Sequence, residues 1–193
     1  MSVFHANWLD AAATSADLVR AQLLLGKYPC SANMIITAYT LARHAHTGQT
    51  DKNGDEYINH PWRIGVALHP AGHEKVIVAL GWLHDVVEDT GLSIDEVMAA
   101  FPLRTPRNWT QDDIDRLRAG LDAITQRQNE PREDYYARVL TSPEALIVKD
   151  ADINDNTSPE RVAQLDEATR IRLAAKYAKA RKILGFDEPV RNA

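Results

Sequence analysis

A cluster of ionisable residues interrupts an apolar stretch near the middle of the chain. The segment "LGWLHDVVEDTG" places His84, Asp85, Glu88 and Asp89 among leucine, tryptophan and valine side chains. A buried polar group without a partner costs about 1 to 3 kcal/mol, and an unpaired buried charge costs more. On a helix, residues three and four positions apart share a face, so these side chains would form one polar patch. The pattern therefore predicts a partner that satisfies them.

The same residues conflict with the electrostatics of the helix that we expect here. Residues 74 to 89 are predicted to form one apolar helix, closed by Thr90-Gly91. Glu88 and Asp89 would then lie in its last turn, where the macrodipole disfavours each negative charge by a few tenths to about 1 kcal/mol. A bound cation would remove this conflict. Gly81, one turn earlier on the same face, would allow a ligand or another backbone to approach closely.

Further candidate metal ligands lie outside this segment. His60 precedes Pro61 at an expected helix start, and "VKDADINDN" supplies Asp150, Asp152 and Asp155 after an apolar run. Neutral imidazoles and carboxylates suit Mn²⁺, Fe²⁺, Zn²⁺ or Mg²⁺, and two histidines with two aspartates leave positions open for water and a substrate. A hydrogen-bonded structural His-Asp pair fits the isolated doublet as well, so chemistry alone leaves both interpretations open.

Three segments, taken together and in order, carry a family resemblance. They read "AHTGQTDKNGDEYINHP", "GWLHDVVEDTG" and "VKDADINDN". They resemble the HD-domain metal-dependent phosphohydrolases, specifically the hydrolase domain of the RelA/SpoT family and the small single-domain (p)ppGpp hydrolases. The resemblance covers roughly residues 31 to 184. It implies an all-α HD-domain helical bundle, a divalent metal with Mn²⁺ as the expected ion, and hydrolysis of the 3′-pyrophosphate of a nucleotide.

The resemblance also implies roles for individual residues. The implied metal ligands are His60, His84, Asp85 and Asp152. Glu88 and Asp89 match a pair that orients or deprotonates the attacking water. This role is physically reasonable, because a metal lowers the pKa of water and a carboxylate one helical turn away can move its proton.

Other matched residues are expected to meet the substrate or to support the site. Lys52 matches a basic position that faces the nucleotide, although a loop lysine is equally compatible with solvent exposure. Asn156 matches an asparagine that contacts the sugar or a phosphate. His46 and Tyr57 match the segment before the histidine-proline motif, and we expect them mainly to support its loop.

Two departures from the family pattern bear on the substrate. The alarmone hydrolases typically have an arginine before the loop lysine, whereas this chain has Asp51, which cannot stack on guanine and would repel phosphate. Asp150 replaces the usual apolar residue inside "K-x-A-D". The expected metal site is unaffected. Hydrolysis of another nucleotide or phosphoester therefore stays open, as does a nucleotide-sensing module without turnover.

The elements that must position these residues are predicted to be helices, because apolar residues recur at helical spacing and no strand or repeat is evident. A short helix should begin at His60 and end near "LHPAGH". The other expected helices cover residues 7–25, 31–46, 74–89, 93–101, 110–128, 135–140 and 160–184. We expect an N-terminal helical extension over residues 1–30, the HD domain over residues 31–184 and a tail over residues 185–193.

The bulk composition limits the partners. The 193 residues are 45% hydrophobic and 25% charged, as in an ordinary globular domain. A net charge of -5 disfavours nucleic acid or an anionic membrane as the main partner. No signal peptide and no membrane-spanning apolar run is evident, which predicts a cytoplasmic protein. The single cysteine, Cys30, excludes an internal disulfide, and the oligomeric state stays open.

Overall fold

Helices form the regular elements of residues 31–51, 54–103 and 107–186, which are the residues that the computed structural model describes. They are α2 (Met34–Ala45), α3 (Asn59–Leu68), α4 (Lys75–Leu83), α5 (Val86–Thr90), α6 (Ile94–Met98), α7 (Gln111–Ile124), α8 (Arg132–Val139), α9 (Pro143–Asn156), α10 (Pro159–Val162) and α11 (Glu167–Leu184). Within these ranges there is no strand, only an isolated bridge between Thr50 and Glu56. The predicted all-α fold class is confirmed.

Some predictions concern residues outside this described part. They include the N-terminal extension over residues 1–30 with its helix at 7–25, Cys30, Lys52, and the tail beyond Phe186. None of the described helices is both long enough and apolar enough to cross a membrane.

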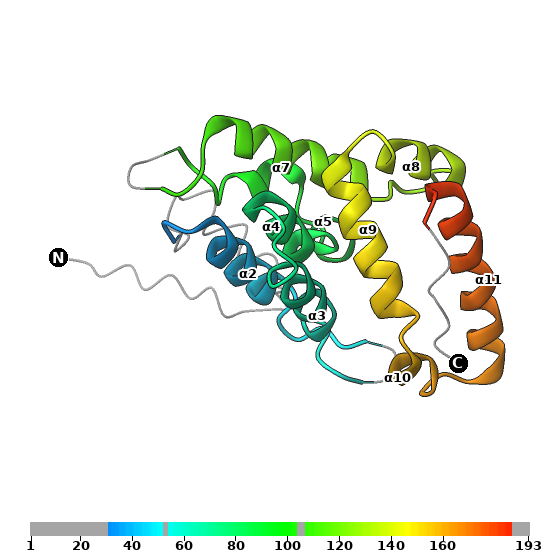
Figure 1. Cartoon of the computed structure of the whole chain (residues 1–193). Coiled ribbons are helices and arrows are strands. Elements are labelled where there is room, and N and C mark those ends of the chain that lie inside the picture. Colours follow the sequence, from blue (N-terminus) through cyan, green and yellow to red (C-terminus); the bar gives the residue numbers. More distant parts are fainter. Residues whose placement is uncertain (1–30, 52–53, 104–106, 187–193) are drawn as a thin grey trace.

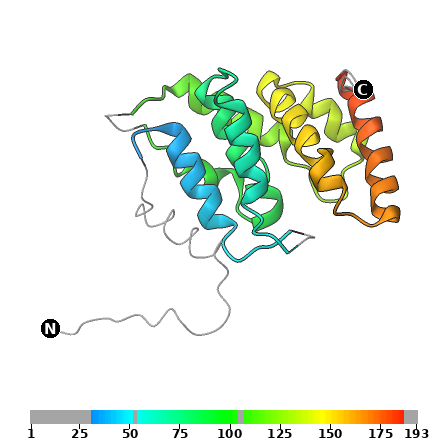
Figure 2. The ribbon, with the colours of Figure 1, turned by 60° about the horizontal axis from the view of Figure 1, so that its bottom comes forward.

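Helix α4 is the centre of the fold. Every residue from Val76 to Leu83 is buried, as expected for a helix that is apolar on all sides. It packs against α2, α3, α7 and α9, which surround it in Figures 1 and 2. Glycines allow α3 to approach closely: a Cβ atom at Gly81 would lie 2.7 Å from Leu68 Cδ1, and one at Gly65 would lie 2.4 Å from Trp82 Cε2. This close approach brings the start of α3 next to the end of α4.

The prediction of one helix over residues 74–89 is wrong. Helix α4 ends at Leu83 and α5 begins at Val86, with His84 and Asp85 in the turn between them. At this turn the buried imidazole of His84 forms a hydrogen bond with the Gly81 carbonyl, with Nδ1 2.9 Å from that oxygen. Glu88 and Asp89 consequently belong to a separate short helix and lie in its first turn. The conflict with the macrodipole that the sequence suggested does not arise.

The prediction of one helix over residues 160–184 is also wrong. The chain forms α10, leaves the helical conformation, and starts α11 at Glu167. Asp166 is the N-cap of α11: its backbone is extended and its side chain accepts hydrogen bonds from the backbone N–H and the hydroxyl of Thr169. Gly185, with φ 72°, ends α11 where predicted.

Helices α6 and α7 begin directly after N-cap residues that the sequence makes recognisable. Ser93 and Glu96 form a capping box at the start of α6, and Thr110 and Asp113 form one at the start of α7. Helix α7 ends at Ile124, four residues earlier than predicted, and α8 begins at Arg132, three residues earlier. Helix α9 packs on α3, α4 and α7.

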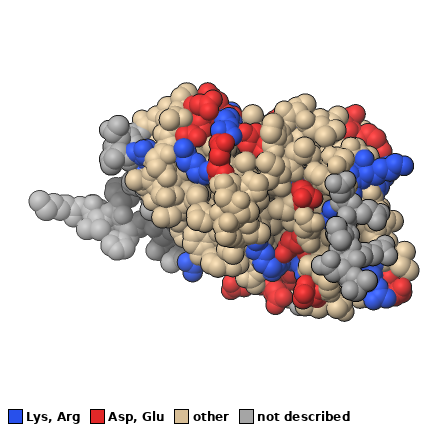
Figure 3. Space-filling view, in the orientation of Figure 1, with Lys and Arg blue, Asp and Glu red and all other residues tan. Residues whose placement is uncertain are grey.

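Helix α11 lies at the end of the fold opposite α2 in both ribbon views. Its packing partners are mainly α8 and α9. On the face shown in Figure 3, acidic and basic side chains are interspersed, with no large area of a single sign. The site described next therefore does not lie under a broad charged surface on this face.

Candidate metal centre

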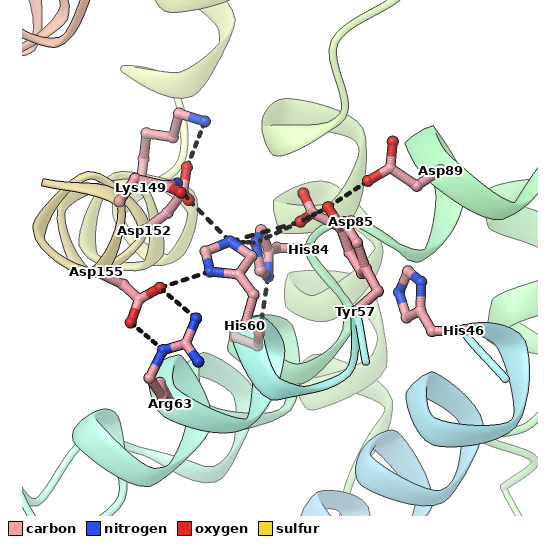
Figure 4. Close-up of polar contacts among 12 residues, drawn as sticks. His46, Tyr57, His60, Arg63, His84, Asp85, Asp89, Lys149, Asp152 and Asp155 are labelled. Carbon is pink, nitrogen blue, oxygen red and sulfur yellow. Dashed lines mark hydrogen bonds and ion pairs between the residues drawn. The ribbon is translucent and has the colours of Figure 1, made fainter. Parts of the chain in front are cut away.

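Two histidines from different helices meet at the centre of the fold. His60, at the start of α3, and His84, at the end of α4, have their Nε2 atoms 3.3 Å apart. Asp85 Oδ2 lies 3.1 Å from His84 Nε2 and 3.6 Å from His60 Nε2, and Asp152 Oδ1 from α9 lies 3.1 Å from His60 Nε2. Figure 4 shows the four side chains converging. The structure thus brings together all four residues expected to bind a metal.

The other ring nitrogens define how each imidazole is held. His84 Nδ1 lies 2.9 Å from the Gly81 carbonyl, and His60 Nδ1 lies 2.8 Å from Asp155 Oδ2. A carbonyl and an ionised carboxylate only accept hydrogen bonds, so each Nδ1 must carry a proton and donate it. In the neutral rings both Nε2 lone pairs then face the same point. Histidine ligands of metals are held in this way, through the ring N–H that does not face the ion.

The charge of the two imidazoles depends on whether their Nε2 atoms carry protons. Burial opposes charge on His60, but its hydrogen bonds with Asp152 and Asp155 outweigh burial and raise its pKa to about 9. Burial also opposes charge on His84, and Asp85 raises the pKa of that ring. A cation of higher charge could take the place of the Nε2 protons, and its binding would release them. His60, His84 and Asp85 together could hold such an ion.

Asp152 is held by its own helix. Lys149 Nζ lies 2.7 Å from Asp152 Oδ2, and the amide of Asn156 donates to Asp152 Oδ1 at 2.5 Å. The spacing of three and four residues places all three side chains on one face of α9. Burial would raise the pKa of Asp152, but Lys149 and the histidines hold it well below its usual range. Asn156, expected to contact a nucleotide, therefore also fixes a candidate ligand while it lines the cavity.

Tyr57 contacts the site directly, beyond the supporting role that the sequence predicted. Its hydroxyl lies 2.7 Å from Asp85 Oδ2 and 2.5 Å from Asp89 Oδ2. The hydroxyl has one proton, so it can donate to only one of these carboxylates at a time. His46 stacks on the Tyr57 ring, with the ring centroids 4.9 Å apart. Gln49 contacts His46 Nδ1 and donates a hydrogen bond to the Asp89 carbonyl, so it connects the end of α2 to α5.

Glu88 and Asp89 point to different partners, so the expected single patch is divided. Asp89 faces Tyr57, whereas the Glu88 carboxylate accepts a hydrogen bond from the Gln126 backbone N–H at 3.0 Å. Burial raises the pKa of both carboxyl groups, and the Asp85 charge adds to the effect on each. Both side chains line the same cavity as the histidines.

That cavity has a volume of about 460 Å³ and extends from the histidines to α11. Its basic lining residues are Arg132, Lys149, Arg161, Arg172 and Lys176. Lys149 and Arg161 form ion pairs with aspartates of α9, whereas no ion pair to an acidic side chain is seen for the other three within the described ranges. We call these three residues, Arg132, Arg172 and Lys176, the cationic wall. Burial, together with repulsion from Lys149 and Arg132, lowers the pKa of Lys176. Asp51 lines the cavity as well, and its side chain accepts a hydrogen bond from the Asp55 backbone N–H.

Comparison with known proteins found relatives that share a printed enzyme name. No family model matches the chain. The guanosine-3′,5′-bis(diphosphate) 3′-pyrophosphohydrolase MESH1 of Mus musculus is 34% identical over 127 residues, which is 63% of this chain and 66% of that protein. A protein of the same enzyme name from Aquifex aeolicus is 32% identical over 140 residues, and a probable one from Synechocystis is 28% identical over 144 residues. These similarities agree with the resemblance to RelA/SpoT-like HD-type hydrolases that the three motifs carry.

Coverage differs strongly among these RelA/SpoT-like relatives. The matches take in 69% and 71% of this chain but only 18% of the Aquifex protein and 19% of the Synechocystis protein. The chain therefore spans less than a fifth of the length of these two relatives.

Sequence reasoning in terms of this family missed several residues that surround the site. The cationic wall comes from α8 and α11, outside the three motifs. A signal was present in the four-residue spacing of Arg172 and Lys176, followed by Tyr177, which is buried on the same helix. The contact of Asp155 with His60 joins residues 95 positions apart, and no local pattern encodes it.

Proposed function

We propose that this chain is a metal-dependent phosphohydrolase that removes pyrophosphate from the 3′ position of (p)ppGpp. One observation carries the chemistry: the Nε2 atoms of His60 and His84 face the same point while both Nδ1 atoms are engaged elsewhere. The names of the relatives support the substrate, since two of them are called guanosine-3′,5′-bis(diphosphate) 3′-pyrophosphohydrolase.

The residues at this point fit a divalent ion. Two imidazole nitrogens and the carboxylates of Asp85 and Asp152 form a mixed nitrogen and oxygen donor set, as Mn²⁺ accepts. We propose Mn²⁺ as the ion and His60, His84, Asp85 and Asp152 as its ligands. When bound, such an ion supplies Lewis-acid activation of water and of a phosphoryl oxygen.

The protein's own groups then handle the proton. Glu88 and Asp89 line the cavity beside the proposed ligands, and burial raises the pKa of both, which makes each a better proton acceptor. Water adds to the phosphorus attached to the 3′ oxygen, and its proton passes to one of these carboxylates. The bond between phosphorus and the 3′ oxygen breaks, pyrophosphate leaves, and the 3′ oxygen takes up a proton.

The positive charge of the cationic wall complements the negative charge of the substrate's phosphate groups. Arg132, Arg172 and Lys176 stand together in a protein whose net charge is -5. The repulsion that lowers the pKa of Lys176 would be relieved by a bound anion. We propose that phosphate groups of the nucleotide contact this wall while the 3′-pyrophosphate reaches the histidines.

The test is release of pyrophosphate and phosphate from a panel of nucleotides, with ppGpp among them, in Mn²⁺, Mg²⁺ or chelator. Pyrophosphate release from ppGpp should require the metal and should be absent in Asp85→Ala. Asp95→Asn, which changes an exposed carboxylate on α6, is the matched control and should retain activity. Metal-independent release, or full activity in Asp85→Ala, would contradict the proposal.

One observation favours a different nucleotide or phosphoester as substrate. Asp51 lines the cavity, where its negative charge would oppose a phosphate. If this position disfavours the alarmone, Asp51→Arg should raise kcat/KM for ppGpp relative to other nucleotides. An unchanged ratio would count against this account of specificity. Thermal stabilisation by a nucleotide without any product would instead indicate a sensing module.

A further inference from the structure

Asp155 joins two residues of α3 to α9. Its Oδ2 lies 2.8 Å from His60 Nδ1, and its Oδ1 accepts from Arg63 Nε at 2.6 Å. Arg63 Nη2 also donates to Oδ2, at 3.1 Å, which makes the pair bidentate. Figure 4 shows the carboxylate between the imidazole and the guanidinium. His60 and Arg63 are three residues apart and therefore present one face of α3 to this single side chain.

The surroundings keep Asp155 ionised. The Asp155 side chain is 11% exposed, and Arg161 Nη1 lies 3.4 Å from Oδ2 as a further cation. Arg63 and Arg161 thus place two guanidinium cations on this one carboxylate. An ionised carboxylate can only accept, so the proton of the contact with His60 must be on Nδ1.

The Asp155 side chain contacts one of the proposed metal ligands, His60, and also pairs with Arg161. It does not line the cavity that contains the histidines, the proposed acid-base pair and the cationic wall. Instead, Asp155 and Arg63 line a second cavity of about 540 Å³. The equivalent contact of His84 is made by a backbone carbonyl, that of Gly81, which no side-chain substitution can remove. Of the two imidazoles, only His60 depends on a replaceable partner.

We propose that Asp155 is a positioning residue: held by Arg63, it fixes His60 with the proton on Nδ1 and the Nε2 lone pair directed at His84, Asp85 and Asp152. The inference rests on the metal centre of the proposed function and names an additional determinant of its affinity. Partners of this kind orient the ring and increase its basicity, and their loss typically weakens metal binding by about 10- to 100-fold.

The test is the affinity of the chelator-stripped full chain for Mn²⁺, measured by calorimetry without nucleotide. Asp155→Ala should bind Mn²⁺ about 10- to 100-fold more weakly than the wild type, and Arg63→Gln should show a smaller loss. The matched control is Asp150→Asn on the same helix, whose side chain is 42% exposed and lies 3.7 Å from Arg181. It should bind as the wild type does. Affinity within twofold of wild type in Asp155→Ala would overturn the inference.

A second readout separates positioning from a loss of folding. Asp155→Asn keeps the shape of the side chain and removes its charge, so it serves if Asp155→Ala does not fold. In the zinc-loaded protein, long-range ¹H–¹⁵N NMR should show the His60 Nδ1 proton at a strongly downfield shift, and Asp155→Asn should move it upfield. An unchanged Nδ1 proton would contradict the assignment.

The outcomes distinguish this inference from the proposed function. If the wild type binds Mn²⁺ and hydrolyses ppGpp while the Asp155 variants match it in both affinity and spectrum, the positioning role fails and the hydrolase function stands. If the wild type binds no divalent ion, the metal centre fails, and the inference fails with it.

Discussion

The centre of the molecule and the α11 side of its cavity are built in different ways. At the centre, His60, His84 and Asp152 are buried, and their donor and acceptor atoms have partners from other helices or from their own helix. Helix α11 has 18 residues, of which four are buried, and α8 and α9 are its main packing partners. We infer that the fold fixes the groups proposed to react, whereas the residues proposed to meet the rest of the substrate can vary at little cost in stability.

The largest effect is expected where a central donor is removed. His84→Ala deletes one of the two converging Nε2 atoms, and the three remaining donors cannot complete the mixed set. We expect Mn²⁺ binding to fall below detection by calorimetry and pyrophosphate release to fall to background. His44→Ala, on the partly exposed side of α2, is the control. Unchanged Mn²⁺ affinity in His84→Ala would show that the ion binds elsewhere.

A second substitution separates the handling of the proton from metal binding. Glu88→Gln keeps the size of the side chain and its contact with Gln126 but removes its capacity to accept a proton from water. We expect kcat to fall by about 10²- to 10⁴-fold while Mn²⁺ affinity stays within a few-fold of wild type. Steady-state kinetics together with calorimetry measure both quantities. A parallel loss of metal affinity would instead make Glu88 a ligand.

The stability difference between the two regions can be measured directly. Leu83→Ala removes a fully buried side chain next to the histidine turn and should lower the free energy of unfolding by about 2 to 5 kcal/mol. Ile171→Ala changes a side chain of α11 that is 61% exposed and should alter it by about 0.5 kcal/mol or less. Urea unfolding of the metal-free protein gives both values. Equal losses would contradict the proposed division between the regions.

A smaller effect is expected at the cationic wall. Lys176→Met retains the aliphatic part of the side chain and removes the charge that faces the cavity. It should raise KM for ppGpp by about 10-fold, the value of one charged hydrogen bond, with little change in kcat. Lys179→Met, three residues further along α11, removes a lysine that pairs with Glu133 on the surface and is the control. An equal KM for the two variants would remove Lys176 from substrate binding.

Much of the fold could be predicted from local signals. Capping boxes at Ser93 and Thr110 and the glycine at position 185 set helix ends that the structure shows. The convergence of the four candidate ligands followed from the three motifs and the family they resemble. In each case the information lies in residue types at short spacing.

The remainder depends on contacts that no local pattern contains. The break after Leu83 accompanies a hydrogen bond of a buried imidazole, and apolar periodicity continues across it. The contacts of Tyr57 with Asp85 and of Asp155 with His60 join residues 28 and 95 positions apart. Asp166 is a recognisable N-cap residue, but the helical pattern continues on both sides of it and does not mark the break.

The most direct test of the central claim is anomalous diffraction at the manganese edge from crystals of the full chain grown with Mn²⁺. We expect one strong peak within coordination distance of His60 Nε2, His84 Nε2 and the carboxylates of Asp85 and Asp152. Diffraction that shows no peak at this point, or a peak only at surface carboxylates, would contradict it.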